Sequence, residues 1–280
     1  MRLARYTYQG HEHWGIVRHN HVHALDGLWP TLSEGLRCGW STMDQAADES
    51  SLVVPLTDVQ WLPPVDAHSK IFCVGLNYGK HVQEAGKAQV PYPSLFLRHL
   101  DSFVGHDQAI QKPACSEQFD FEGELVVVIG REGRHVPADQ AMSYVAGYTC
   151  MAENSVRDFQ KHTAQVTAGK NFDRSGALGP WITAAADVPE PSQLELTTRL
   201  NGCVVQDASV SELIFPIPQL IAYISTFCTL KPGDLIATGT PEGIGFRRSP
   251  PLFMSPGDVL EVVVSGVATL RTPVIQEVIN

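Results

Sequence analysis

Closely spaced cysteines and long apolar runs are both missing from this 280-residue chain. No two of its six cysteines have the C-x-x-C spacing that is typical of zinc sites and thioredoxin-type motifs, so the sequence predicts neither. The N-terminus lacks the apolar core of a signal peptide, and no run reaches membrane-spanning length. We therefore expect a cytoplasmic protein that makes no contact with a membrane.

Clusters of basic residues are missing as well. Lys and Arg number 20 against 30 Asp and Glu, which gives a net charge of -10. Because no basic run supplies phosphate contacts, we expect no nucleic-acid binding. An acidic substrate is not excluded, since a metal ion and a few local cations can reverse the electrostatic field in a cleft.

The composition and the proline pattern predict a turn-rich globular protein of two parts. Hydrophobic residues make up 44% of the chain, with 23 glycines and 19 prolines. The pair Pro63-Pro64 is a plausible boundary. We predict a small α+β domain over residues 1–65 and a larger domain over 66–280. Strand patterns dominate the larger part, with only a few short helices.

Alternating histidines stand out in the N-terminal part. His19, His21 and His23 would share one face of a strand. Such a set either chelates a metal or lies on a plain exposed strand, and the hairpin-like context without a nearby cysteine favours the exposed strand.

The most informative stretch is residues 122–130, which read as a β-strand rich in β-branched residues and closed by a glycine. Glu122 and Glu124 share one face with the valines at 126 and 128, so they lie at the start of a strand that is apolar on both faces. Burying two like charges unpaired costs on the order of several kcal/mol. A divalent cation removes that cost, and oxygen ligands favour Mg²⁺, Mn²⁺ or Ca²⁺ over zinc. The alternative is a solvated strand end.

A second candidate pair follows a short apolar strand near residue 70. Residues 77–86 are expected to form one or two helical turns, with Asn77 as a possible N-cap. His81 and Glu84 then lie on one helix face, where the carboxylate would orient the imidazole and raise its basicity. In the alternative interpretation Glu84 pairs with Lys80 on a surface helix.

A third carboxylate, Glu153, lies where a strand is expected to end and a helix to begin. Ser155 and Asp158 have the spacing of a capping box, and a helix N-terminus favours a negative charge.

Several turns and one helix can also be predicted. Asn201-Gly202 indicates a type I′ hairpin turn, and Gly233 and Gly257, each in a Pro-Gly-Asp motif, indicate type II turns. Residues 213–230 form the best amphipathic helix pattern. Residues 238–245 are either a backbone loop that holds an anion or a plain tight turn.

Taken together, these motifs resemble the fumarylacetoacetate hydrolase family, from about residue 70 to residue 270. Each motif is weak by itself, but their order and spacing make a strong signal. The matching motifs are Val74-Gly75, Asn77-Tyr78, His81-x-x-Glu84, Phe121-Glu122-Gly123-Glu124, Gly147-Tyr148-Thr149, Ser155-x-Arg157-Asp158-x-Gln160, Gly169-Lys170, Leu178-Gly179-Pro180-Trp181, Asn201-Gly202, Pro232-Gly233-Asp234 and Thr238-Gly239-Thr240-Pro241-x-Gly243.

The resemblance implies a mixed β-sandwich roll, usually dimeric, that carries one Mg²⁺ or Mn²⁺ ion and acts on small 2-oxo or 2,4-dioxo acids. Glu122, Glu124 and Glu153 are implied as metal ligands. Two positions depart from the family pattern: position 153 is usually Asp after Asn, and lysine is commoner at position 98, where this chain has arginine. The glutamate places its carboxylate about one C–C bond further from the backbone, and Mg²⁺ and Mn²⁺ both accept it.

The resemblance also implies a reaction, the hydrolysis of a C–C bond in a 2,4-dioxo acid through a metal-stabilised enolate. His81, oriented by Glu84, would activate a water molecule, and Lys170 would stabilise the oxyanion. The substrate carboxylate would be held by four further residues, Arg98, Arg157, Gln160 and Thr240. Isomerisation or decarboxylation of 2-oxo or 2-hydroxy-dienoic acids is the alternative, and a non-catalytic metal-binding protein is a third hypothesis.

Overall fold

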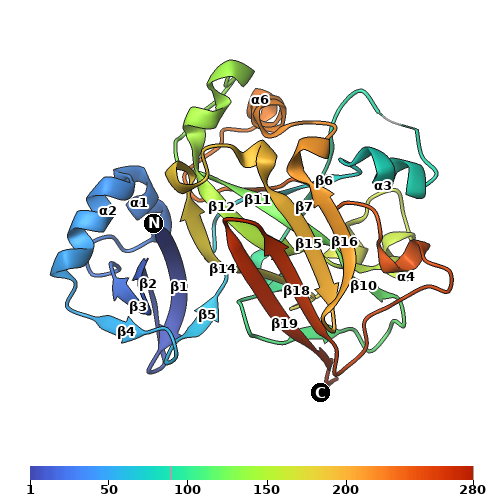
Figure 1. Cartoon of the computed structure of the whole chain (residues 1–280), viewed down its shortest axis with the longest axis horizontal. Helices are drawn as coiled ribbons and strands as arrows, with labels where there is room; N and C mark the ends of the chain where they lie inside the picture. Colours follow the sequence, from blue (N-terminus) through green and yellow to red (C-terminus); the bar gives the residue numbers. More distant parts are fainter. Residues whose placement is uncertain (89, 280) are drawn as a thin grey trace.

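The computed structural model describes residues 1–88 and 90–279, and most of their regular structure is β-strand (Figure 1). The strands of one large sheet are β1 (Arg2–Tyr8), β2 (His11–Arg18), β3 (His21–Ala24), β4 (Val53–Pro55), β5 (Gln60–Leu62), β6 (Ile71–Gly75), β7 (Ser94–Arg98), β8 (Phe103–Val104), β11 (Gly123–Ile129), β12 (Val145–Ala152), β14 (Gly176–Ala184) and β17 (Leu235–Ala237). Those of a second sheet are β9 (Ile110–Lys112), β15 (Glu195–Leu200), β16 (Cys203–Ser209), β18 (Val259–Val264) and β19 (Ala268–Gln276). A short separate pair consists of β10 (Phe119–Asp120) and β13 (Ser155–Val156). The α-helices are α1 (Leu32–Cys38), α2 (Trp40–Ala46), α3 (Gly79–Glu84), α4 (Arg157–Gln160), α5 (Thr167–Lys170) and α6 (Ile217–Phe227).

The two sheets pack face to face around the main hydrophobic core. The large sheet runs in the order β4-β3-β2-β1-β14-β12-β11-β17-β6-β7, and the second in the order β16-β15-β18-β19-β9. Strands β11, β12 and β14 contact β15, β18 and β19. Leu125 and Val127 of β11 share the core with Leu196 and Val262 of the second sheet. This confirms the prediction of a mainly β sandwich with short helices.

Strand β11 is buried on both faces, as its sequence predicts. Leu125, Val127 and Ile129 face the second sheet, and Val126 and Val128 belong to a separate core on the opposite face. All seven residues of the strand are buried. The face that begins with Glu122 and Glu124 is therefore closed to solvent along its length.

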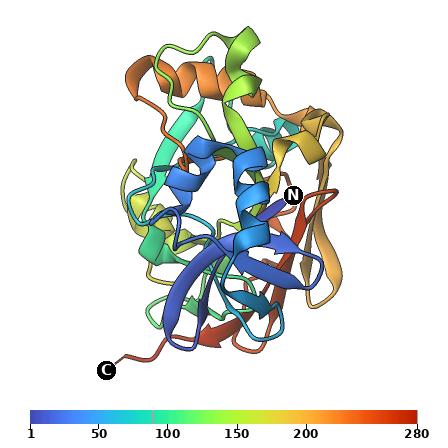
Figure 2. The ribbon, with the colours of Figure 1, turned by 90° about the vertical axis from the view of Figure 1, so that its left-hand side faces the viewer.

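The N-terminal segment joins the large sheet through β1, which pairs with β14. Its helices α1 and α2 supply Leu32, Leu36 and Met43 to the core behind Val126 and Val128. Figure 1 shows this segment in blue at one side of the molecule, and Figure 2 views it from that side. The segment is α+β, as predicted, and the domain boundary at residue 65 stays a prediction.

The turn and helix predictions hold closely. Asn201 and Gly202 have φ values of 52° and 79° between β15 and β16, as a type I′ turn requires, and Gly233 and Gly257 have φ values of 86° and 98°. The helix predicted over 213–230 is α6, which begins after Pro216.

The alternating histidines lie on an exposed hairpin. His19 is in the turn before β3, His21 is exposed, and His23 Nδ1 lies 3.0 Å from Ala47 O. These histidines form no metal-ligating group in the part of the chain that the structure describes. In the same residues, no helix is both long and apolar enough to cross a membrane.

Candidate metal centre and active site

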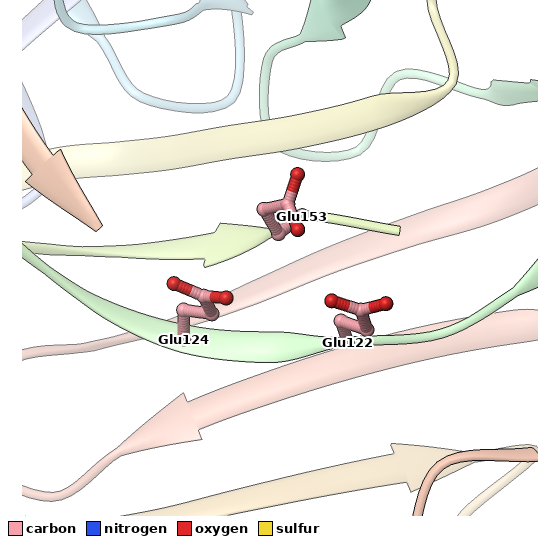
Figure 3. A group of neighbouring side chains, drawn as sticks. All are labelled: Glu122, Glu124 and Glu153. Carbon is pink, nitrogen blue, oxygen red and sulfur yellow. The ribbon is translucent and has the colours of Figure 1, made fainter. Parts of the chain in front are cut away.

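Three glutamates converge because two neighbouring antiparallel strands end at the same point. In the β11–β12 pairing Gly123 faces Ala152, so Glu122 and Glu153 lie side by side just beyond, where Glu153 N donates to Glu122 O at 2.8 Å. Glu124 shares the face of Glu122 because side chains alternate along a strand. Figure 3 shows Glu122 and Glu124 both pointing toward Glu153. One carboxylate oxygen from each of the three lies within 4.8 Å of the others.

Local backbone features bring these strand ends together. Gly123 has no room for a side chain, because a Cβ atom there would lie 2.0 Å from Thr198 Oγ1 of the second sheet. Asn154 turns the chain after Glu153 with a φ of 40°, a left-handed conformation that asparagine tolerates better than most residues. Its side-chain amide donates to Ser175 O at 2.9 Å, which fixes the turn.

Three cations surround the glutamates. Lys170 Nζ donates to Glu122 Oε2 at 2.8 Å and also to Glu153 Oε2. Arg157 lies 2.7 Å from Glu122 Oε1, and its Nε donates to Asp120 Oδ2 at 2.8 Å. Arg98 Nη1 donates to Glu153 Oε1 at 3.1 Å.

Glu124 differs from its neighbours in its partners. It accepts a backbone hydrogen bond from Gly239 N at 2.8 Å, and no cation lies within 4 Å of it among the residues that the structure describes. Four buried carboxylates, those of Asp120 and the three glutamates, thus face three cations, and the cluster carries one negative charge in excess when all are ionised.

The pKa values of the three glutamates reflect this imbalance. Burial, together with the charges of Glu153 and Glu122, raises the pKa of Glu124 well above its ordinary value. Burial also raises the pKa of Glu153, to about 8. Burial opposes the ionisation of Glu122 too, but Arg157 and Lys170 outweigh it and hold its pKa well below the usual range.

The cluster fits a hard divalent cation. Its ligand atoms are all carboxylate oxygens, which Mg²⁺ and Mn²⁺ prefer. A bound divalent ion would also give Glu124 the positive partner that it lacks. The solvated strand end considered from the sequence is wrong, because Glu122, Glu124 and Glu153 are only 5%, 2% and 0% exposed.

The His81–Glu84 pair lies on α3. His81 Nδ1 is 3.1 Å from Glu84 Oε2, so Nε2 is the ring nitrogen left for chemistry. The alternative partner of Glu84 is engaged elsewhere, because Lys80 Nζ lies 2.8 Å from Glu212 and 3.6 Å from Glu242. His81 and Glu84 therefore contact each other, as the sequence suggested, and their catalytic roles stay a prediction.

One loop, residues 238–246 after β17, connects this pair to the glutamate cluster. The loop was expected to hold an anion or to form a plain turn, and the anions that it holds are the chain's own carboxylates. Gly239 and Gly243 have φ values of 109° and 93°, which favour glycine. The loop's backbone bonds run from Gly239 N to Glu124 Oε2 (2.8 Å), from Gly243 N to Glu84 Oε1 (3.1 Å), from Gly245 N to Asp120 Oδ1 (2.8 Å) and from Phe246 N to Asp120 Oδ2 (3.0 Å).

The structure also places the remaining residues suggested by the sequence beside the cluster. Gln160 Oε1 accepts from Arg157 Nη1 at 3.0 Å. Thr240 Oγ1 donates to Gly123 O at 2.9 Å and accepts from Gln206 Nε2 at 2.8 Å. Their contact with a substrate stays a prediction.

Two capping predictions are wrong. Asn77 is not the N-cap of α3, because its side-chain amide donates to Thr238 O at 2.8 Å and its Oδ1 accepts from Phe215 N, which ties the strand end to the loop. Ser155 does not cap α4, because its hydroxyl donates to Glu122 Oε1 at 2.6 Å. In both cases a buried tertiary partner takes the place of the free helix end.

The sequence reasoning missed Asp120, which is fully buried and accepts hydrogen bonds from Arg157, Phe246, Gly245 and Phe121. Replacing it by asparagine should place an amide N–H₂ against Arg157 or the loop donors and remove one of the two carboxylates that contact the buried Arg157. We expect the free energy of unfolding to fall by about 3–5 kcal/mol, the usual cost of breaking a buried ion pair from one side. Urea unfolding measures it.

Asp158→Asn is the matched control for Asp120→Asn. Asp158 accepts from Ser116 Oγ at 2.7 Å and from Phe159 N, with no ion pair among the described residues. We expect this control to cost only about 1 kcal/mol. Equal losses for the two variants would contradict a special role for Asp120.

Comparison with known proteins places this site in a family. Residues 70–275 match the family model described as fumarylacetoacetate (FAA) hydrolase C-terminal, and residues 1–64 match the model described as Rv2993c-like, N-terminal. Oxaloacetate tautomerase FAHD2A from Homo sapiens is 35% identical over 267 residues, which are 93% of this chain and 84% of the human protein.

Two solved structures extend the likeness to nearly the whole fold. The 5-carboxymethyl-2-hydroxymuconate delta-isomerase from Mycobacterium smegmatis has a TM-score of 0.80 at 32% identity, covering 100% of both chains. A maleylpyruvate hydrolase from Sphingobium sp. SYK-6, solved with manganese(II) and pyruvate, has a TM-score of 0.80 at 29% identity, covering 99% of this chain and 100% of that one. On the sequence match over residues 70–275, supported by these relatives, the chain belongs to the fumarylacetoacetate hydrolase family.

Proposed function

We propose that this chain is a metal-dependent enzyme that moves a proton beside the 2-oxo group of a small 2-oxo acid, as a tautomerase or isomerase. The observation that carries the proposal is the loop 238–246, which binds Glu124 of the acidic cluster and Glu84 of the histidine pair at once. The relative named as an oxaloacetate tautomerase, matched over 93% of this chain, favours proton transfer among the reactions of the family.

In the proposed reaction His81 is the base. Its Nδ1 is held by Glu84, so Nε2 takes the proton of the enol hydroxyl and delivers it to the neighbouring carbon, which gives the keto form; the reverse transfer gives the enol. Lys170 binds Glu122 and Glu153 and donates its third N–H to the substrate oxygen on which negative charge develops. A Mg²⁺ or Mn²⁺ ion held by Glu122, Glu124 and Glu153 would supply Lewis-acid stabilisation of that oxygen.

The charge balance supports an anionic substrate. A divalent cation would change the excess charge of the cluster from one negative to one positive, which attracts a carboxylate. We propose that Arg157 and Gln160 hold this carboxylate. Thr240 already donates its hydroxyl hydrogen to Gly123 O, so any substrate contact there uses its remaining acceptor capacity.

Hydrolysis of a 2,4-dioxo acid, the reaction predicted from the sequence, is the second candidate. The same His81–Glu84 pair is suited to activating water, because the Glu84 carboxylate holds Nδ1 of the imidazole and leaves Nε2 to accept a proton. The maleylpyruvate hydrolase solved with manganese(II) and pyruvate also favours this candidate.

Product analysis separates the candidates. The enol form of oxaloacetate and an acylpyruvate are each incubated with the protein and Mn²⁺ or Mg²⁺, and again with EDTA. We expect metal-dependent enol-to-keto conversion without new carbon fragments. Two fragments from the acylpyruvate would favour the hydrolase, and released CO₂ would favour a decarboxylase. Metal binding without any turnover would contradict the proposal and favour a non-catalytic binding protein.

A further inference from the structure

Arg98 ends the edge strand β7, yet its side chain is completely buried. The guanidinium lies over the ring of Phe103, 4.2 Å from the ring centroid. Burial lowers the pKa of Arg98, and the charge of Glu153 opposes this. A buried cation of this kind requires a carboxylate partner. The only carboxylate within 4 Å of it, in the described part of the chain, is Glu153.

The hydrogen bonds of Arg98 occupy most of its N–H groups, so few donors are left to bind a substrate. Nε donates to Ser102 Oγ at 3.1 Å, and Nη2 donates to Ser175 Oγ at 3.0 Å and to Ser102 O at 3.4 Å. Nη1 donates to Glu153 Oε1 at 3.1 Å. With five N–H groups in a rigid fork, an arginine held in this way has a fixed orientation.

The two carboxylate oxygens of Glu153 contact different partners. Its Oε1 is held by Arg98, and its Oε2 contacts Lys170, which also binds Glu122. Oε2 is therefore the oxygen turned toward the other glutamates. The contact with Arg98 fixes which oxygen this is.

We propose that Arg98 is a positioning residue for the metal centre: it holds Glu153 by one oxygen so that the other is presented with Glu122 and Glu124. The two positions at which this chain departs from the family pattern, 98 and 153, are thus in direct contact and form a matched pair. The inference rests on the metal dependence proposed above, and it replaces the substrate contact that the sequence suggested for Arg98.

The matched pair follows from side-chain geometry. An aspartate at 153 would withdraw the carboxylate by about one C–C bond and leave the Arg98 guanidinium buried without its ion-pair partner. A lysine at 98 presents a single ammonium in place of the planar fork, so it cannot serve Ser102, Ser175 and Glu153 together. Each single change should therefore weaken Mn²⁺ binding. The fold-loss of affinity in the double variant should be smaller than the product of the two single fold-losses.

Titration calorimetry of the full chain with Mn²⁺, without substrate, tests the positioning role. Arg98→Lys should raise the Kd for Mn²⁺ by about 10- to 100-fold, the usual loss when a residue that orients a metal ligand is changed. Arg98→Met should lose at least as much if it folds, as judged by circular dichroism. Arg131→Lys is the control, since Arg131 also lies over an aromatic ring, that of Tyr144, but has no carboxylate partner within 4 Å in the described residues.

The KM for the 2-oxo acid, measured at saturating Mn²⁺, distinguishes a positioning role of Arg98 from a substrate contact. Positioning predicts a change in Kd for the metal and little change in KM. A raised KM with an unchanged metal Kd would overturn the proposal and restore Arg98 as a substrate contact. The metal measurement does not depend on turnover, so the proposed reaction can fail while this inference stands.

A double-mutant cycle tests the pairing itself. Glu153→Asp, Arg98→Lys and the double variant are titrated with Mn²⁺ under the same conditions. We expect the double variant to bind Mn²⁺ more tightly than the product of the two single losses predicts. Independent effects would show that positions 98 and 153 are not a matched pair.

Discussion

His81→Ala is expected to lower kcat by about 10²- to 10⁴-fold, the usual contribution of a positioned general base, and to leave the Mn²⁺ affinity unchanged. The reason is that His81 contacts Glu84 and none of the three glutamates of the cluster. Without the imidazole, nothing oriented by Glu84 remains to take the proton. Steady-state kinetics with saturating metal and calorimetry with Mn²⁺ measure the two quantities separately.

Gln83→Ala is the matched control for His81→Ala, because Gln83 is exposed on the same helix and the substitution removes a side chain of similar length. Turnover of this variant should stay close to that of the unmodified protein. Added imidazole should restore part of the lost activity of His81→Ala, since it can enter the space and act as the base. Undiminished turnover of His81→Ala would remove His81 from the mechanism, whichever of the two candidate reactions the protein performs.

Much of the site could be predicted because it is encoded in local patterns. Glu122 and Glu124 lie on a strand whose alternation fixes their common face, and the strand is buried as its valines indicate. The hairpin turn at Asn201-Gly202 requires positive φ at both residues, and Asn-Gly is the residue pair that favours such a turn. The family resemblance supplied the convergence of Glu153, and the register of β11 and β12 explains it.

The remainder depends on contacts that no local pattern encodes. Asp120 is an unremarkable residue in sequence, and its importance comes from a loop more than a hundred residues away that donates two backbone N–H groups to it. Asn77 and Ser155 have the residue types of helix caps, so their local signals pointed to the wrong partners. Arg98 was assigned to the substrate carboxylate from the family resemblance, and its buried contact with Glu153 could not be seen from its neighbours in the sequence.

The charge asymmetry of the cluster leads to the second large expected effect. Glu122 contacts two cations, whereas Glu124 has the Gly239 amide as its one hydrogen-bond partner among the residues that the structure describes. Because burial and the neighbouring carboxylates raise the pKa of Glu124, folding favours its protonated form. A carboxyl whose pKa is raised on folding stabilises the folded state while it is protonated, and it loses that contribution as the pH rises through its folded-state pKa. Without metal, an ionised Glu124 is therefore destabilising.

Glu124→Gln is expected to raise the Tm in EDTA above that of the unmodified protein at alkaline pH, while it abolishes the increase in Tm on adding Mn²⁺. The glutamine oxygen can keep the hydrogen bond from Gly239 N, and the three remaining carboxylates then balance the three cations. Loss of a direct ligand should weaken Mn²⁺ binding by more than about 100-fold, the upper end of the loss for residues that only orient a ligand. Turnover should fall with metal occupancy. Thermal denaturation with and without Mn²⁺, repeated across pH, measures the effect.

Glu122→Gln provides the contrast that identifies the cause. This change removes one of the two carboxylates that contact Arg157 and one of the two that contact Lys170, whereas Glu124→Gln removes no ion pair. It should lower the Tm in EDTA, since breaking a buried ion pair from one side is strongly destabilising. Both variants lose one of the three proposed metal ligands, so an opposite sign of their effects on the metal-free protein would come from the different cation partners of the two glutamates. If both variants lowered the Tm in EDTA equally, the assignment of Glu124 as the carboxylate that depends on a metal for its charge balance would be wrong.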